Sequence, residues 1–174
     1  MNRLSTPLSI GVISDTHGRM HARVFDLFSG VDHILHAGDI GTEEVLIDLR
    51  AIAPVTVVHG NVDVFSPLEK YPEETEIILG GVRVHLVHQV APLLQRLDRG
   101  QWQGHLPQVL VYGHSHTGLA SRAGDVLLFN PGSAGPRRFD KIPSVGFLTI
   151  ENGVATPKLV ALEPAEQELL AGAS

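Results

Sequence analysis

The chain of 174 residues is long enough to bury a substantial core, and its 43% hydrophobic and 18% charged residues are typical of a globular protein. The net charge of -6 gives no general attraction to nucleic acid, and the absence of cysteine means that any bound metal must be held by nitrogen and oxygen ligands. No apolar run approaches a membrane span and the first residues lack a signal-peptide core, so we expect one cytoplasmic domain over residues 1–174.

The first half of the chain alternates strand-like apolar runs with helical patterns. Three runs end in polar residues: 8–14 before Asp15 and His17, 33–37 before Asp39, and 55–59 before Asn61. Helical patterns over residues 20–28 and 42–53 separate them, the second with Thr42 as its expected capping residue. Such alternation predicts a parallel α/β layer with right-handed crossovers. Because ligands bind beyond the carboxyl ends of such strands, we expect these polar residues to face one site.

The second half of the chain is dominated by turn signals typical of hairpins. Gly80-Gly81, Gly124-Asp125 and Asn152-Gly153 each separate two β-rich runs. The paired runs are 74–79 with 82–87, which leads into His88, then 119–122 with 126–129, and 145–150 with 154–162. Between the first two hairpins we expect a helix over 91–98 and a buried strand over 109–112 that leads into Gly113-His114-Ser115-His116. Residues 163–174 are expected to form a loose tail or a short helix.

The predicted strand ends together supply more donors than one tetrahedral metal ion can use. The donors are Asp15, His17, Asp39, Asn61, His88, His114 and His116. Two hard or borderline divalent ions would use all of them if one carboxylate bridges the pair. Metal ions about 3.5–4 Å apart promote in-line displacement at phosphorus, because they generate hydroxide near neutral pH and neutralise charge on the phosphate oxygens.

Each of these residues taken singly has a simpler explanation. Asp15, Asp39 and Asn61 suit turns or helix caps, and His88 suits the end of a strand. Only the joint pattern predicts a metal site. Of the remaining histidines, His36 and His59 are interpreted as core or supporting residues, and His21, His33, His85 and His105 as structural or surface residues.

The order and spacing of these motifs resemble those of the calcineurin-like metallophosphoesterases. The matching motifs are Asp15-x-His17, Gly38-Asp39, Gly60-Asn61-x-Asp63, His88 and Gly113-His114-x-His116. The small single-domain bacterial and archaeal phosphodiesterases of that superfamily look most similar, and Asn130-Pro131-Gly132-Ser133 is similar to a loop of that subgroup. The resemblance implies an α/β fold, a four-layer α-β-β-α sandwich of two mixed sheets flanked by helices.

The resemblance also implies a role for each motif residue. Two divalent metal ions are implied, bound by Asp15, His17 and His116 on one side and by Asn61, His88 and His114 on the other, with Asp39 as the bridge. Asp63 would orient ligands. Asp39, Asn61 and His114 would be catalytic by positioning metal and phosphate. Mn²⁺ is the expected metal, with Zn²⁺, Ni²⁺, Fe and Co as alternatives.

The implied activity is that of a metal-dependent phosphoesterase, and more specifically a phosphodiesterase. A hydroxide that bridges the metals would attack the phosphate ester. The expected substrate is a small phosphodiester or phosphomonoester, since the acidic chain has no basic stripe for long nucleic acid and no segment for a membrane. A homo-oligomer is compatible with the sequence.

Two positions depart from the pattern of relatives. Gln89 follows His88, where many relatives have glycine, so it would either narrow the approach to the second metal or contact substrate. Val62 follows Asn61, where larger phosphatases have a histidine that protonates the leaving group, so no general acid is identified. Arg137 and Arg138 are interpreted equally well as phosphate-binding forks or as solvated surface residues.

Two other functions compete with the phosphoesterase hypothesis. A scaffold protein of the same fold, such as the retromer subunit, would mediate protein–protein assembly, but that reading predicts degraded ligands and every ligand position here is intact. A hydrolase of the metallo-β-lactamase type also uses His-x-His. That family continues with a further Asp-His, whereas this chain continues with Thr117-Gly118.

Overall fold

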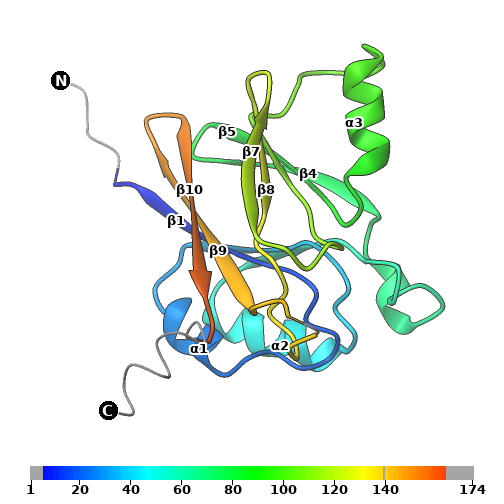
Figure 1. Cartoon of the computed structure of the whole chain (residues 1–174). Coiled ribbons are helices and arrows are strands. Elements are labelled where there is room, and N and C mark those ends of the chain that lie inside the picture. The colour runs from blue at the N-terminus through cyan, green and yellow to red at the C-terminus, as the bar shows by residue number, and fades with distance from the viewer. Residues whose placement is uncertain (1–5, 139, 164–174) are drawn as a thin grey trace.

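Two sheets, each of five strands, form the centre of the molecule (Figure 1). The computed structural model describes residues 6–138 and 140–163, so residues 164–174 of the predicted tail lie outside the described residues. The first sheet has the order β10-β9-β1-β2-β3, with β1 (Leu8–Ile13), β2 (His33–His36), β3 (Val55–Val57), β9 (Ser144–Glu151) and β10 (Val154–Ala161). The second sheet has the order β4-β5-β6-β8-β7, with β4 (Glu74–Leu79), β5 (Val82–Val87), β6 (Val109–Val111), β7 (Leu119–Ala123) and β8 (Val126–Asn130).

Helices cover the outer faces of both sheets. Helices α1 (Arg23–Leu27) and α2 (Glu43–Ile52) pack on the first sheet, in a buried cluster that includes Phe28 and Leu46. Helix α3 (Ala91–Asp98) packs on the second sheet through Leu93. A third cluster, which includes Leu35, Leu86 and Phe129, joins the sheets to each other. The α-β-β-α layering is therefore confirmed, and each interface is held by burial of apolar side chains.

The parallel strands β1, β2 and β3 follow the prediction for the first half of the chain. Ile13 pairs with His36, and His36 pairs with Val57, so the carboxyl ends of the strands lie side by side. The inner strands β1 and β2 are largely buried, as expected for strands covered on both faces, although His33 and His36 stand at the two ends of β2. The loops that carry Asp15, Asp39 and Asn61 consequently leave the sheet at one edge.

The second half of the chain is less antiparallel than its turn signals indicate. The three predicted hairpins are present as β4–β5, β7–β8 and β9–β10. However, β6 lies parallel to both β5 and β8, and α3 forms the crossover between β5 and β6. The hairpin β9–β10 returns to the first sheet, where β9 pairs antiparallel with β1. Turn residues determine pairing within a hairpin, but they do not determine which strand lies beside it.

Some element boundaries differ from the predictions. Helix α1 begins at Arg23, not near residue 20, and Thr42 occupies the N-cap position of α2 without making a side-chain capping bond. Strand β3 ends at Val57 because the backbone N–H of His59 donates to the carbonyl of Pro72 at 3.0 Å, which takes the chain out of the sheet. No helix in the described part of the chain is long and apolar enough to cross a membrane.

Candidate metal centre

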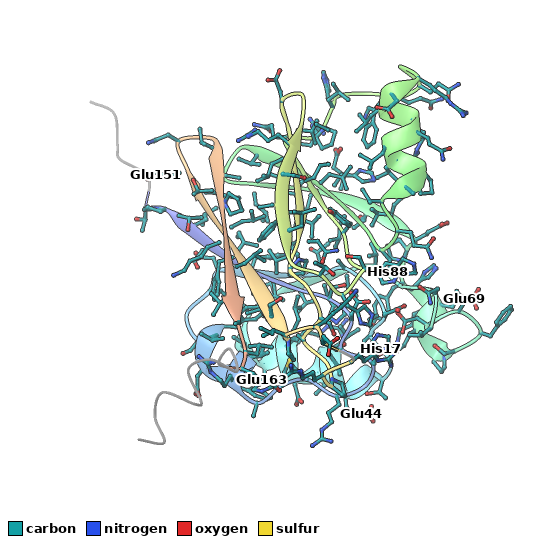
Figure 2. All side chains as sticks on the ribbon, in the orientation of Figure 1. His17, Glu44, Glu69, His88, Glu151 and Glu163 are labelled. Carbon is teal, nitrogen blue, oxygen red and sulfur yellow. The ribbon has the colours of Figure 1, made fainter. Side chains whose placement is uncertain are left out.

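The loops that follow β1, β2, β3, β5 and β6 bring all the predicted donors to one region. In Figure 2, His17 and His88 lie on the same side of the molecule, far from Glu151 at the end of β9. The donor side chains form two adjoining groups. The first donor cluster is Asp15, His17 and His116, and the second donor cluster is Asn61, His88 and His114, with Asp39 between them.

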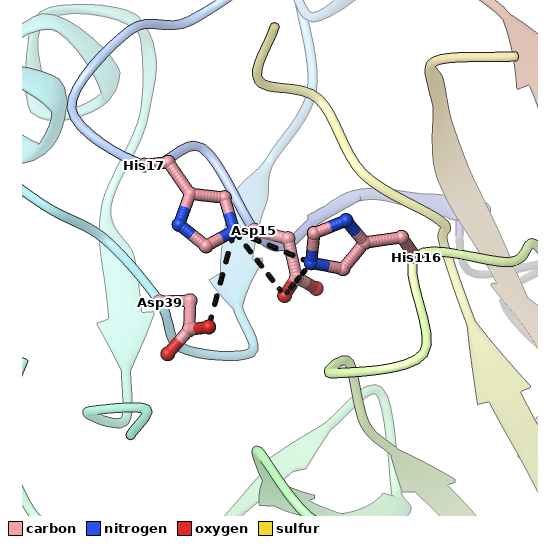
Figure 3. Close-up of side chains that lie close together, drawn as sticks. All are labelled: Asp15, His17, Asp39 and His116. Atoms are coloured by element: carbon pink, nitrogen blue, oxygen red, sulfur yellow. Dashed lines mark hydrogen bonds and ion pairs between the residues drawn. The ribbon is translucent and has the colours of Figure 1, made fainter. Parts of the chain in front are cut away.

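The first donor cluster is compact and rich in carboxylate oxygen. One ligand atom from each of Asp15, His17, Asp39 and His116 lies within 4.8 Å of the others. His116 Nε2 is 3.1 Å from Asp15 Oδ1 and 3.3 Å from His17 Nε2 (Figure 3). His17 Nε2 is 3.9 Å from both Asp15 Oδ1 and Asp39 Oδ2. Two imidazoles and two carboxylates at this spacing form a donor set suited to a divalent ion.

The second donor cluster is organised around an amide oxygen. Asn61 Oδ1 lies 3.1 Å from His88 Nε2 and 3.0 Å from His114 Nδ1. His88 Nε2 is also 3.3 Å from Asp39 Oδ1. One oxygen of Asp39 therefore faces His88 in this cluster, while the other faces His17 in the first. Asp39 therefore contacts an imidazole nitrogen of each cluster.

Asp15 has one carboxylate oxygen that accepts no hydrogen bond from the described residues. Asp15 Oδ2 accepts from Ser14 Oγ at 2.7 Å and from the His114 N–H at 3.1 Å, but the buried Oδ1 has no hydrogen-bond partner among the described residues. Such a buried acceptor is costly unless something satisfies it. His88 Nδ1–H donates to the Ala37 carbonyl at 2.8 Å, which turns Nε2 towards Asn61. The residues present therefore fit a bound cation.

Burial and neighbouring charge shift the pKa of several donors. Burial lowers the pKa of His17, and the nearby Arg138 guanidinium lowers it further, which favours the neutral imidazole that binds metal. Burial opposes ionisation of Asp39, but the hydrogen bond from His88 and its positive charge outweigh burial and lower the pKa of Asp39. Burial likewise opposes the charged form of His88, yet its contacts with Asp39 raise the pKa of His88 overall. Asp39 is thus held as the carboxylate.

Most of the donor residues have a strained backbone conformation. Positive φ angles, between 48° and 70°, occur at five donor residues: Asp15, His17, Asp39, His114 and His116. Each such conformation costs about 1–3 kcal/mol and persists only where the surrounding structure imposes it. Two glycines permit the close approach of the loops, because an added Cβ would lie 2.1 Å from Asp39 Oδ1 at Gly60 and 2.0 Å from Ser14 Oγ at Gly113.

Asp63 lies fully buried behind the donors. Its carboxylate accepts hydrogen bonds from the backbone N–H groups of Ile40 at 3.0 Å, Gly41 at 2.9 Å and Gly60 at 2.8 Å. These bonds tie the loop that carries Asp39 to the loop that carries Asn61. This geometry suits the orienting role predicted for Asp63, which remains a prediction.

Two further residues support the loops of the site: Asn130, which was not assigned a role from the sequence, and His36, which was interpreted from it as a core or supporting residue. Asn130 donates from Nδ2 to the Gly113 carbonyl at 2.9 Å and to Ser115 Oγ at 3.1 Å, so it holds the loop that carries both predicted histidines. The only sequence signal for Asn130 was the similarity of the loop Asn130-Pro131-Gly132-Ser133 to a loop of the phosphodiesterase subgroup. His36 is fully buried beside Thr16, 3.0 Å from its hydroxyl, and burial lowers the pKa of His36 to about 4. His36 is therefore a neutral supporting residue.

The chain matches a known family along most of its length. Residues 8–153 match the model of the calcineurin-like phosphoesterase superfamily domain. A probable metallophosphoesterase of Methanocaldococcus jannaschii is 34% identical over 166 residues, which cover 92% of this chain and 84% of that protein.

Solved structures share the fold. A conserved uncharacterised protein of Streptococcus pneumoniae, a predicted phosphoesterase, has a TM-score of 0.71 and 26% identity over 90% of this chain and 91% of its own. A novel archaeal phosphodiesterase has a TM-score of 0.69 and 21% identity, over 88% and 100% of the chains. Vacuolar protein sorting 29 of Cryptosporidium parvum has a TM-score of 0.68 and 19% identity, over 88% and 97%. The sequence matches and the shared fold together place the chain in the calcineurin-like phosphoesterase superfamily.

Proposed function

We propose that this protein is a metal-dependent phosphodiesterase that holds two divalent ions. The observation that carries the proposal is the position of Asp39, whose Oδ2 faces His17 at 3.9 Å and whose Oδ1 faces His88 at 3.3 Å. A carboxylate that only capped a turn would have no reason to lie between two sets of ligand-type side chains. The unsatisfied Asp15 Oδ1 supports the same proposal.

The roles of the residues follow from the two clusters. Asp15, His17 and His116 would hold one ion, Asn61, His88 and His114 the other, and Asp39 both. Bound there, two divalent ions would supply hydroxide near neutral pH and neutralise charge on the phosphate oxygens. Asp39, Asn61 and His114 would act by fixing where the phosphate sits relative to the ions. Asp63 would fix the positions of the loops that carry Asp39 and Asn61 relative to each other.

The donor set limits the metal but does not select a single one. Imidazole nitrogen with carboxylate and amide oxygen suits Mn²⁺, Zn²⁺, Ni²⁺, Fe and Co. Asp15 and Asp39 supply carboxylate oxygen, which suits Mn²⁺ as the first candidate. The site lacks an evident protein acid for the leaving group, since Val62 follows Asn61 and donates its backbone N–H to Asp39 Oδ1 at 3.0 Å. Either water would protonate the departing alkoxide, or the leaving group would be one that departs without a proton.

A small diester is the proposed substrate class. The net charge of -6 does not favour long nucleic acid. The archaeal phosphodiesterase shares the fold, and the Methanocaldococcus jannaschii relative is a probable metallophosphoesterase. Both support ester hydrolysis at phosphorus, and the first supports the preference for a diester.

The test is hydrolysis of bis(p-nitrophenyl) phosphate and of p-nitrophenyl phosphate by chelator-stripped protein, with Mn²⁺, Zn²⁺ or Ni²⁺ added back in turn. We expect turnover that requires added metal and favours the diester. Preference for the monoester would replace the phosphodiesterase with a phosphatase. Two bound ions without turnover of either ester would contradict the proposed substrate class.

A scaffold function is the second candidate, favoured by the shared fold with vacuolar protein sorting 29. It predicts tight binding of a partner protein by the metal-free chain and no turnover with any added metal. The intact donor set argues against it, because a scaffold has no need for strained backbone at Asp15, His17 and Asp39.

A further inference from the structure

A cavity of about 370 Å³ opens beside the second donor cluster. It lies between the loop after β3, the start of β4 and the beginning of α3. Its apolar wall is formed by Val64, Val87, Pro92 and Leu93, and its polar wall by His59, Glu73, Glu74, Gln89 and Arg96. The volume falls within the range of pockets that hold small organic ligands.

The cavity is continuous with the candidate metal centre. Asn61 and His88 line the cavity and also belong to the second donor cluster. A phosphate placed against these two residues would therefore direct one of its ester groups into the cavity. Gln89, which follows His88 directly, also lines the cavity.

The charge of the cavity is negative, because only one of its two acids is paired. Arg96 donates two hydrogen bonds to Glu74, from Nη2 to Oε2 at 2.6 Å and from Nη1 to Oε1 at 3.4 Å. Glu73 has no ion pair with any residue that the structure describes. The unpaired Glu73 carboxylate therefore disfavours a phosphate or carboxylate on the entering group relative to an uncharged one.

The opposite flank of the metal centre has the reverse charge. Arg137, Arg138 and Lys141 lie there around His116. Arg137 pairs with Glu163 at 3.6 Å, and Arg138 is near enough to His17 to lower the pKa of its imidazole. Any additional anionic group of a substrate is therefore favoured on this side and disfavoured in the cavity.

The polar wall of the cavity offers acceptors. His59 Nδ1–H donates to the Tyr71 carbonyl at 2.7 Å, which leaves Nε2 for another partner. Gln89 and Glu73 add a carbonyl oxygen and a carboxylate. These groups suit hydroxyl donors.

From these observations we infer that the cavity binds one alcohol group of the diester, and that it selects an uncharged, hydroxyl-bearing group over an anionic one. The inference rests on the proposed function, since it assigns the cavity to the substrate of the same site.

Matched substrates test the inference. The p-nitrophenyl diesters of 4-hydroxybutyl phosphate and 3-carboxypropyl phosphate differ mainly in hydroxyl against carboxylate, and both release p-nitrophenol. For the metal-loaded protein we expect kcat/KM to favour the hydroxyl substrate by at least about tenfold, the usual scale when a pocket rejects one group. Equal values for the two substrates would overturn the inference.

Charge reversal identifies the residue responsible. Glu73→Lys should reduce or invert the preference, whereas Glu151→Lys, with the same change of net charge at an exposed position far from the site, should leave it as in the wild type (Figure 2). Pro92→Phe narrows the cavity at an exposed helix start and should lower kcat/KM for the hydroxybutyl diester more than for ethyl p-nitrophenyl phosphate. Pro67→Phe, at the start of the short helix η1 (Pro67–Lys70), is the matched control outside the cavity. Identical responses of Glu73→Lys and Glu151→Lys would contradict the assignment.

A binding measurement separates failure of this inference from failure of the proposed function. Calorimetric titration with 4-hydroxybutyl phosphate and 3-carboxypropyl phosphate reports selection without turnover. If no diester is hydrolysed but the hydroxyl ligand binds more tightly in a manner that depends on Glu73, the proposed function fails and the subsite stands. If diesters are hydrolysed and both ligands bind equally, the subsite fails and the proposed function stands.

Discussion

The two donor clusters share Asp39 but differ in charge and exposure. The first contains Asp15, which is fully buried and has an unsatisfied oxygen. The second contains the neutral amide of Asn61, which lines the cavity, and both Asn61 and His114 are exposed. Since affinity for a divalent cation rises with the number of charged ligands and with the rigidity of the site, the first cluster is suited to retain an ion and the second to present one to substrate. Under the proposed function, the first cluster would retain its ion and the second would bring its ion into contact with substrate.

The largest effect is expected from the residue that the clusters share. Asp39→Asn removes the negative charge from the carboxylate between them and should lower kcat for the diester by about a thousandfold, the scale seen when a preorganised electrostatic group is lost. Metal-supplemented turnover measures this. Asp48→Asn, an exposed change on α2, is the control. Near-normal turnover by Asp39→Asn would show that the clusters do not act through Asp39.

The contrast between the clusters predicts unequal losses of metal affinity. Asp15→Asn should weaken the tightest-bound ion by more than about a hundredfold, beyond what loss of a supporting hydrogen bond causes. Asn61→Ala should spare that ion and weaken the second. Competitive Mn²⁺ titration of both variants distinguishes the two sites. Equal effects on the tightest ion would remove the distinction between the clusters.

Asp63 should affect both clusters because it holds their loops together. Asn at this position keeps one carbonyl oxygen but replaces the other with an amide donor, so at least one buried N–H loses its acceptor. We expect the free energy of unfolding to fall by about 2–3 kcal/mol. Chemical denaturation of the metal-free protein measures the change, and Asp98→Asn at the exposed end of α3 should cause almost none. Unchanged stability would mean that the loops do not depend on Asp63.

His36 predicts an effect on stability that depends on pH. Its pKa is lowered to about 4 in the folded protein, against an ordinary value of 6.5, because the imidazole is fully buried. As pH falls from 6.5 towards 4 the unfolded chain binds the proton and the folded chain does not, so stability is lost by about 1.4 kcal/mol per pH unit. Unfolding of metal-free wild type and His36→Gln across this range isolates the contribution. Equal pH slopes in the two proteins would contradict it.

Local patterns in the sequence were sufficient to propose the donors but not to predict their surroundings. Apolar runs that end in Asp39 or Asn61 identify strand ends, and Gly80-Gly81 identifies a hairpin, because these signals depend on neighbouring residues. The pairing of β9 with β1 and of β6 with β8 depends on contacts distant in sequence, which no local pattern encodes. The three backbone bonds of Asp63, and the cavity beside Asn61, likewise appear only when separate loops meet.

The most direct test of the account is whether Asp39 joins two ions in one centre. Electron paramagnetic resonance of the Mn²⁺-loaded protein, combined with metal analysis, answers this without reference to any substrate. We predict two Mn²⁺ ions per chain and the spectrum of an exchange-coupled pair, which Asp39→Asn should convert to that of uncoupled Mn²⁺. A single ion per chain, or two uncoupled ions in the wild type, would contradict the dinuclear centre.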